Sequence, residues 1–239
     1  MRPLGAILLR ALRSSPAAAE EVVRRIRNRI VHNAPEIGGS ESEEDDEADL
    51  DELPSILSGR DERLIEALDR LLVGLESLVA DSKLDALVRR LAAWQSRGRW
   101  PGAICILSEY RSTLFYLQTE LERLGLHSTL FHGAMSFDER SRAVHVSSER
   151  KGILVATTAA VATGVNLAQF DVLLFYDLPS SPLRLRQVVG RFKRLGRMTP
   201  LAVKVLLHPQ GSDFAQDSIL RRLRGLVLDE GQTGVAESH

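Results

Sequence analysis

The chain of 239 residues is nearly neutral, with 31 lysines and arginines against 32 aspartates and glutamates. This balance excludes a uniformly basic nucleic-acid-coating protein, so any such contact must come from local clustering of charge. Hydrophobic residues make up 44% and aromatic residues 5%, which favours an α/β or helical protein over an all-β one. Cys105 is the only cysteine, which excludes an internal disulfide framework and a cysteine-based zinc site and favours a reducing, cytoplasmic setting.

Residues 1–33 predict a basic helical segment. Ser15 followed by Pro16 is typical of a helix start. Apolar residues then recur at helical spacing, and arginines share the helix with them. Two interpretations stay open: a solvated basic face beside a packing stripe, or a helix that contacts DNA or a partner. The apolar positions are Val22, Val23, Ile26 and Ile30, and the arginines are Arg24, Arg25, Arg27 and Arg29.

The first ten residues carry a short apolar run that Arg10 interrupts. A secretory signal needs a longer uninterrupted run, and a membrane span needs about 20 apolar residues. We therefore expect neither secretion nor a membrane partner.

Residues 34–60 predict an acidic flexible linker, because their few apolar side chains bury too little surface to offset the entropy of ordering. Residues 46–49 spell the letters DEAD, which in some ATPases mark a magnesium-binding motif. Such a motif ends a buried hydrophobic strand, whereas serine, glutamate and aspartate precede these letters. We expect no catalytic role for them.

Residues 61–100 predict a helical lead-in to the main domain. A broad apolar face runs along residues 61–80, and a second helix follows from Ser82. Trp94 and Trp100 lie near the end of this lead-in, where we interpret them as packing residues rather than base-stacking ones. The apolar face of the first helix consists of Leu64, Ile65, Leu68, Leu71, Leu72, Leu75, Leu78 and Val79.

Residues 101–228 predict an α/β domain, because short apolar runs alternate with helical segments. This alternation favours a mainly parallel sheet with helices on both faces, and ligands bind such sheets at the carboxyl ends of strands. Residues 229–239 predict a disordered tail. The expected strands are 103–107, 128–131, 153–157, 172–176 and 202–207, and the expected helices are 111–124, 137–148, 183–194 and 213–227.

The strongest functional signal is the segment 187–197, Gln-Val-Val-Gly-Arg-Phe-Lys-Arg-Leu-Gly-Arg. Because Arg191 and Arg194 are three positions apart, we expect both guanidinium groups on one helical face, where they suit a polyphosphate. Gly190 permits close approach of the backbone to a ligand. The alternative is an ordinary basic surface helix. The pattern Gln-x-x-Gly-Arg-x-x-Arg-x-Gly resembles motif VI of superfamily-two helicases, which implies that Gln187 and Gly190 bind ATP and that both arginines bind it as catalytic fingers.

Residues 153–167 give the second signal, a buried strand ending in Ala-Thr and a small-residue loop ending in Gly-Val-Asn-Leu. Small residues let backbone N–H groups face a phosphate. The segment resembles motif V of the same superfamily. The resemblance implies that Thr157 and Thr158 contact a nucleic-acid phosphate, while Gly164 and Asn166 border the ATP cleft.

Two weaker matches complete the order. Residues 103–111, a strand and a polar turn, resemble motif IV, and residues 130–136 resemble the His-Gly segment that touches the nucleic-acid backbone in that superfamily. The resemblance implies nucleic-acid contacts for Ser108, His132 and Gly133. His132 is too isolated in the sequence to indicate a metal, so no metal site is predicted.

The amino-acid sequences of two further segments are similar to those of the Swi/Snf and RapA-like branch of the superfamily. These are residues 81–87, before the first expected strand, and residues 176–182, before motif VI. Gly196-Arg197 departs from the Gly-Gln of many Swi/Snf remodellers, which leaves DNA versus RNA open with DNA favoured. The resemblance covers about residues 81–225 and implies the C-terminal RecA-like half of a helicase or DNA translocase.

Charge is unevenly distributed in the segment that carries motif VI. Residues 178–212 contain no aspartate or glutamate. The chain therefore concentrates positive charge where the resemblance implies phosphates. The basic residues there are Arg184, Arg186, Arg191, Lys193, Arg194, Arg197 and Lys204.

The sequence lacks the Gly-Lys step of a phosphate-binding loop. The resemblance therefore implies that ATP and Mg2+ are held mainly by an N-terminal RecA-like domain of the same motor, and that this chain alone does not hydrolyse ATP. Two alternatives remain. The chain is a standalone nucleic-acid-binding module with a degenerate helicase fold, or it is a partner-binding protein that uses the 61–80 helix and the acidic linker.

Overall fold

A computed structural model describes residues 4–32, 62–78, 80–193, 200–207, 214–228 and 235–238. Contacts divide the chain into two units, Met1–Asp81 and Ser82–His239, each of which is described by itself. The whole of the predicted linker, including the letters at residues 46–49, lies outside the described residues, as does Arg194 of motif VI. No described helix combines the length and apolar character that crossing a bilayer requires.

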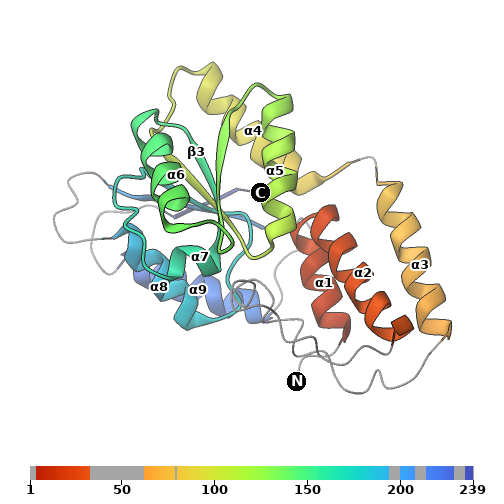
Figure 1. Cartoon of the computed structure of the whole chain (residues 1–239). Coiled ribbons are helices and arrows are strands. Elements are labelled where there is room, and N and C mark those ends of the chain that lie inside the picture. The colour runs from red at the N-terminus through yellow and green to blue at the C-terminus, as the bar shows by residue number, and fades with distance from the viewer. Residues whose placement is uncertain are drawn as a thin grey trace. The chain divides into compact units, whose positions relative to one another are not determined.

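The first unit consists of three helices, α1 (Leu4–Ser14), α2 (Pro16–His32) and α3 (Glu62–Glu76) (Figure 1). Ser15 caps α2, since its hydroxyl oxygen accepts the N–H of Ala18 at 3.1 Å, which confirms the predicted helix start. α2 packs against both α1 and α3. The predicted apolar stripe of α2 is buried and forms the contact surface: Val22, Val23, Ile26 and Ile30 are each 2% exposed or less.

The arginines of α2 are matched by carboxylates of the same unit. Arg24 pairs with Glu20 at 2.8 Å, and Arg25 pairs with Glu21 at 2.8 Å, each one helical turn away. Arg27 reaches across to Asp69 on α3 at 2.5 Å. These pairs favour the interpretation of α2 as a solvated basic face beside a packing stripe over a helix that contacts DNA.

The second unit contains a six-stranded sheet in which every described pair of neighbouring strands is parallel. The strand order is β2-β3-β1-β4-β5-β6. This arrangement confirms the predicted α/β fold with a parallel sheet. The strands are β1 (Ile104–Ser108), β2 (Ser128–Phe131), β3 (Ile153–Thr157), β4 (Val172–Phe175), β5 (Ala202–Leu206) and β6 (Val235–Ser238).

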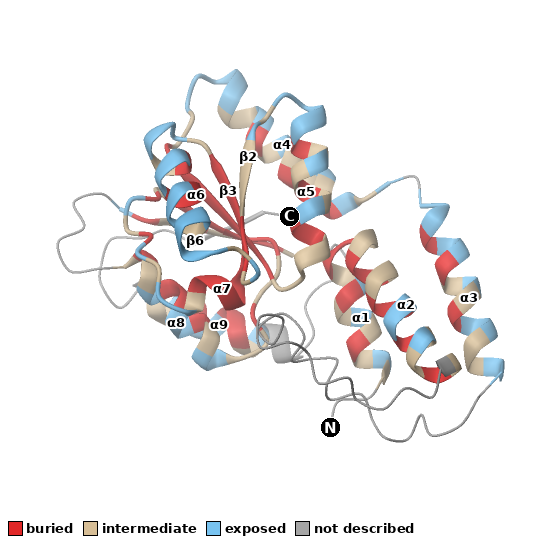
Figure 2. Ribbon diagram, viewed as in Figure 1, coloured by how far each residue is buried: buried red, intermediate tan, exposed pale blue. Residues whose placement is uncertain are grey.

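Helices cover both faces of the sheet (Figure 2). Alternate side chains of β1 to β5 belong to two different apolar clusters, one on each face. In β1, Ile104 and Ile106 pack under α4 (Ser82–Ser96) and α5 (Arg111–Arg123). Cys105 and Leu107 pack on the opposite side. Burial of such apolar side chains stabilises the fold by roughly 1.5–3 kcal/mol each. The helices on the Cys105 side are α6 (Phe137–Glu149), α7 (Thr158–Ala162), α8 (Pro182–Phe192) and α9 (Phe214–Leu228).

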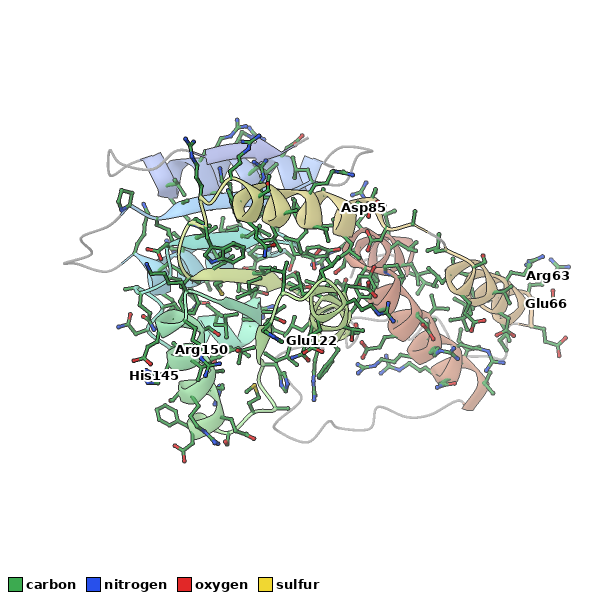
Figure 3. The ribbon with its side chains drawn as sticks, turned by 90° about the horizontal axis from the view of Figure 1, so that it is seen from above. Arg63, Glu66, Asp85, Glu122, His145 and Arg150 are labelled. Atoms are coloured by element: carbon green, nitrogen blue, oxygen red, sulfur yellow. The ribbon has the colours of Figure 1, made fainter. Side chains whose placement is uncertain are left out.

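Charged side chains of these covering helices lie on the outside. Asp85 on α4, Glu122 on α5, and His145 on α6 project away from the sheet, as does Arg150 just beyond α6 (Figure 3). The amphipathic patterns in the sequence therefore describe two covering layers: apolar positions face the strands, and most charged positions face solvent, with Lys83 on α4 a buried exception.

Hydrogen bonds and aromatic packing stabilise the amino edge of the sheet. Asp171 accepts the N–H of Ala103 at 2.9 Å, and a side chain at Gly102, where φ is +108°, would place its Cβ only 2.0 Å from that carboxylate. Trp100 donates its indole N–H to the carbonyl of Lys151 at 2.6 Å and meets Trp94 edge-on. These contacts support the interpretation of both tryptophans as packing residues.

The structure differs from the sequence prediction at three boundaries. The helical lead-in is divided, because α3 belongs to the first unit and α4 to the second. The small-residue loop after β3 contains the short helix α7. Within the predicted disordered tail, residues 235–238 form the edge strand β6. An edge strand is held by backbone hydrogen bonds to its neighbour, so a strand of four residues, two of them polar, needs no continuous hydrophobic run to pair with β5.

Candidate functional site at the carboxyl edge of the sheet

The parallel register brings the predicted motif segments to one edge of the sheet. Ser108 at the end of β1 lies opposite Thr157 at the end of β3, and Leu107 of β1 lies opposite Phe175 of β4. Phe131 of β2 lies opposite Ala156 of β3, which places His132 at the same edge. The turns that resemble motif IV, motif V and the His-Gly segment therefore follow adjacent strands, as the sequence predicts.

A buried ion pair anchors the centre of this edge. Lys83 near the start of α4 lies 2.6 Å from Asp177 just after β4, and their side chains are only 6% and 11% exposed. The other oxygen of Asp177 accepts the hydroxyl of Ser108 at 2.5 Å and the N–H of Glu109 at 3.4 Å. The Lys83 ammonium also lies 4.4 Å from the ring centre of Tyr176, a cation–π distance. The pair therefore joins α4 to the ends of β1 and β4.

Sequence reasoning missed this ion pair, although both partners lie in segments that it singled out. Residues 81–87 and 176–182 served only as indicators of the branch. The available signal is a lysine on the apolar face of an amphipathic helix, four residues before buried Leu87. A buried lysine at such a position needs a carboxylate, and Asp177 directly after a buried strand is a natural candidate.

Glu109, also not predicted, connects two further segments of the edge. One carboxylate oxygen accepts the hydroxyl of Thr158 at 3.0 Å, and the other accepts the N–H of Ser180 at 3.2 Å. Thr158 follows β3 and Ser180 follows β4, while Glu109 itself follows β1. One carboxylate thus links the three segments that follow β1, β3 and β4, the second of which is the start of α7.

The three predicted phosphate-binding hydroxyls are buried in this structure. Ser108, Thr157 and Thr158 are each 1% exposed or less. Ser108 and Thr158 donate their single hydroxyl hydrogens to carboxylates, and the Thr157 oxygen accepts the N–H of Ala160 at 3.3 Å to cap α7. Phosphate oxygens are acceptors, so a hydroxyl that already donates to a carboxylate has no hydrogen to offer them. Nucleic-acid contacts at these residues stay a prediction.

His132 lies under the ring of Phe115, with ring centres 5.8 Å apart and 8% of the residue exposed. Burial lowers the pKa of His132, the charge of Arg111 lowers it further, and Glu139 opposes both effects. The lowered pKa favours the neutral ring, so His132 would meet a phosphate as a neutral donor. Gly133 follows it and is half-buried. No cluster of three or more metal-ligating side chains occurs in the described part of the chain.

Arg191 ties the helix that resembles motif VI to the segment that resembles motif V. Its guanidinium donates to the carbonyl of Ala162, at the end of α7, at 2.8 Å. Its own carbonyl accepts the N–H of Leu167 at 3.0 Å. Gln187 and Gly190, which lie on the same helix α8, are exposed. The structure therefore brings the two strongest sequence signals into direct contact.

The expectation that Arg191 and Arg194 share one helical face stays a prediction, because Arg194 lies outside the described residues. α8 ends at Phe192, and Lys193 is extended, with φ −93° and ψ 99°. The ammonium of Lys193 donates to the carbonyls of Leu226 and Val227, at 2.6 and 3.4 Å, in the last turn of α9. The negative end of a helix attracts a cation, and this contact accompanies the departure of the chain from α8 before the second arginine.

Gly164 and Asn166 lie on the turn between α7 and β4, and both are exposed. Gly164 has a φ of +130°, a conformation that other residues rarely adopt, and no atom lies within 4 Å of the place where a Cβ would be. The side chain of Asn166 accepts the N–H of Ala168 at 3.2 Å and so holds its own turn. Open space beside Gly164 would permit a ligand to approach the backbone; ATP contacts here stay a prediction.

Comparison with known proteins agrees with this geometry. Residues 82–196 match the model of the family described as helicase conserved C-terminal domain. The chain is 35% identical over 94 residues to the uncharacterized ATP-dependent helicase YqhH of Bacillus subtilis (strain 168), a match that covers 39% of this chain and 17% of YqhH. It is 30% identical over 139 residues to the RNA polymerase-associated protein RapA of Proteus mirabilis (strain HI4320), covering 57% of this chain and 14% of RapA.

A solved structure of the C-terminal part of the Fun30 ATPase domain shares the fold, with a TM-score of 0.50 at 18% identity over 85% of this chain and 65% of that one. The sheet and its carboxyl-edge motifs therefore define a helicase domain of the RecA-like class. Residues 82–196, just under half of the chain, are thus similar to helicase C-terminal domains, and the relatives that the chain resembles include RapA. Its matches span less than a fifth of the length of YqhH and RapA.

Proposed function

We propose that the chain is the C-terminal motor half of an ATP-dependent helicase or translocase that acts on nucleic acid. The contact between Arg191 and Ala162 carries the proposal, because it couples the motif VI helix to the motif V turn at 2.8 Å. In a motor of this kind, movement at the nucleotide must reach the nucleic-acid track. A hydrogen bond between the two motifs is a direct route for that coupling.

The ATP-binding part of the proposal rests on Arg191, Arg194, Gln187, Gly190, Gly164 and Asn166. ATP would supply the phosphoryl-transfer chemistry. Arg191 retains further N–H donors after its bond to Ala162, and these can orient and neutralise phosphate oxygens. The absence of carboxylates between residues 178 and 212 leaves its positive charge available for that purpose.

The described part of this chain contains no group of three or more side chains that could ligate a metal ion. The sequence also lacks the Gly-Lys step of a phosphate loop. We therefore assign Mg2+ and most of the ATP contacts to an N-terminal RecA-like domain of the same motor, and we expect this chain alone to be inactive. A cytoplasmic setting belongs to the same proposal.

The nucleic-acid track would run over the turns after β1, β2 and β3, with Ser108, His132, Gly133, Thr157 and Thr158 at or beneath its surface. DNA is the preferred ligand in this proposal, because the chain is related to the Swi/Snf-like branch. The net charge of −1 argues against a standalone nucleic-acid-binding module, whose affinity would depend on a basic surface.

A reconstitution experiment tests the proposed function. The chain is assayed for ATP hydrolysis alone and together with the N-terminal RecA-like domain of a RapA-like protein, each with duplex DNA, single-stranded DNA or RNA. We expect turnover only from the combination, with stimulation by DNA. Turnover by the pure chain that disappears in Arg194→Ala would contradict the assignment of two halves, and DNA binding without any turnover in the combination would favour the non-catalytic alternative.

A further inference from the structure

Glu109 occupies hydrogen-bond donors that a phosphate could use. Its two carboxylate oxygens take the hydroxyl of Thr158 at 3.0 Å and the N–H of Ser180 at 3.2 Å. These donors come from two different turns at the carboxyl edge. A phosphodiester recognised at this edge would place its two free oxygens on neutral donors of the same kind. The carboxylate therefore has the charge and the contacts of a bound phosphate.

Asp177, the other carboxylate of this edge, has a different role. It is nearly buried and lies 2.6 Å from the ammonium of Lys83, so its charge is balanced within the domain. It also accepts the backbone N–H of Glu109, although at 3.4 Å. The backbone of Glu109 is thus fixed by Asp177, whereas the Glu109 side chain is only half-buried and extends to donors on the neighbouring turns.

We propose that Glu109 is a placeholder for a nucleic-acid phosphate. In the free domain its carboxylate keeps Thr158 and the turn at Ser180 in position for binding. When the strand binds, a backbone phosphate takes both donors and the Glu109 side chain turns to solvent. The inference rests on the proposed function, since it takes the ligand to be a nucleic-acid backbone. It also explains how the buried hydroxyl of Thr158 becomes available to a phosphate.

The displacement of Glu109 opposes binding, because the carboxylate competes for the donors and repels the phosphate. Glu109→Gln removes the negative charge. The amide keeps one oxygen that can accept the Thr158 hydroxyl, and its NH2 group replaces the oxygen that accepts the Ser180 N–H. We expect Glu109→Gln to bind a fluorescent duplex DNA about fivefold more tightly, the scale of one unit charge a few ångströms from a phosphate in a wet site. Fluorescence anisotropy of the full chain at low salt measures this effect.

Two further variants make the test specific. Glu122→Gln removes the same charge from the exposed far end of α5 (Figure 3) and should leave DNA affinity unchanged. Thr158→Val removes the hydroxyl donor while keeping a similar shape, and combined with Glu109→Gln it should abolish most of the gain. Competition with inorganic phosphate distinguishes the sources of the ligand: free phosphate should displace DNA only weakly if the site is formed for a strand.

The outcomes separate this inference from the proposed function. If wild type binds DNA and Glu109→Gln binds equally or more weakly with unchanged thermal stability, Glu109 only positions the turns and the placeholder idea is wrong. If no variant binds DNA or RNA even at low salt, the proposed function fails and the inference fails with it. Should Glu109→Gln not fold, a gain in affinity by Glu109→Ala still supports the idea, and a loss by that folded variant overturns it.

Discussion

α2 and α8 are both arginine-rich helices, but their arginines have opposite surroundings. Arg24, Arg25 and Arg27 of α2 pair with carboxylates on α2 itself or on α3. Arg184 and Arg186 of α8, by contrast, make no ion pair among the described residues, and Arg191 on the same helix donates to a backbone carbonyl.

The difference lies in where the acidic residues are, not in how many arginines each helix carries. The sequence of α2 supplies a glutamate one turn before two of its arginines, whereas residues 178–212 contain no acidic residue. Exposed pairs such as those of α2 contribute about 0–1 kcal/mol and leave little charge for a ligand. An arginine on a neutral carbonyl keeps its positive charge, which supports the proposal that α8 rather than α2 meets phosphates.

The largest expected effect comes from Arg191. In the motor reconstituted with an N-terminal RecA-like domain, Arg191→Ala should reduce DNA-stimulated ATP hydrolysis by about 10³-fold or more, the scale of a lost arginine finger. The loss combines the missing phosphate contact and the broken link to Ala162. Steady-state kcat measures it.

Arg24→Ala on α2 is the matched control, and its kcat should stay within about twofold of wild type because a surface pair contributes little. Equal losses in the two variants would show that the contrast between α2 and α8 has no functional meaning. A second variant, Arg191→Lys, keeps the charge but not the forked geometry, so recovery of activity by lysine would argue against a bidentate role.

The sheet could be predicted from the sequence because its elements have strong local signals. Apolar runs such as Ile153–Thr157 are buried on both sides, and parallel strands of this kind appear as continuous hydrophobic segments. β6 could not be found, since Val235–Ser238 pairs through its backbone at an edge and carries no such pattern. α7 was missed for a related reason: its small residues are equally typical of a loop.

The candidate site could be placed on the sheet but not assembled in detail. Thr158 directly follows β3 at the carboxyl edge, as the sequence predicts, whereas Arg191 near the end of α8 is located by its contacts with Ala162 and Leu167. Lys83 and Asp177, which form the buried ion pair, are 94 positions apart in the sequence. A local sequence pattern cannot predict a contact between residues so far apart. At the end of α8, Lys193 likewise makes a tertiary contact with the last turn of α9 that no local pattern predicts. Periodicity alone would have continued the helix.

The buried pair of Lys83 and Asp177 in the second unit can be compared with an exposed pair in the first unit by the unfolding free energy that each variant loses. Lys83→Met leaves a nearly buried carboxylate without its counter-ion and should cost about 3–5 kcal/mol of unfolding free energy. Arg27→Met breaks the pair with Asp69, whose side chains are 35% and 46% exposed, and should cost about 0–1 kcal/mol. Both tryptophans of the sequence lie in the second unit, so their fluorescence in urea measures the Lys83 variant, and far-UV circular dichroism in urea measures the Arg27 variant in the helical first unit.

The double variant Lys83→Met with Asp177→Asn serves as the control for this prediction. It removes both charges and should recover part of the lost stability, because no uncompensated carboxylate remains. If Lys83→Met is as stable as wild type, the pair does not hold the strand ends together. The difference between buried and exposed pairs would then not distinguish the two units.

The salt dependence of DNA binding gives a smaller but more direct comparison of the two helices. Each phosphate contact by a lysine or arginine contributes roughly 0.9 to the slope of log affinity against log salt concentration. Arg184→Gln with Arg186→Gln should therefore reduce the slope by about 1–2, and Arg24→Gln with Arg25→Gln should leave it unchanged. A reduced slope in the α2 variant alone would reverse the assignment of the basic face.

The smallest expected effect is the pH dependence that His132 gives to the stability of the second unit. Burial lowers the pKa of His132 below its usual value of 6.5, so the unfolded chain binds a proton more readily than the folded one. The stabilising effect of the neutral ring is complete above that value and is lost as the pH falls from it toward the lower pKa of the folded state.

Urea unfolding followed by tryptophan fluorescence should show this decrease in stability at low pH, and His132→Asn should reduce the decrease. His145→Gln, a change at an exposed position on α6 (Figure 3), should retain the wild-type pH dependence. An unchanged decrease in His132→Asn would show that His132 is not the group responsible.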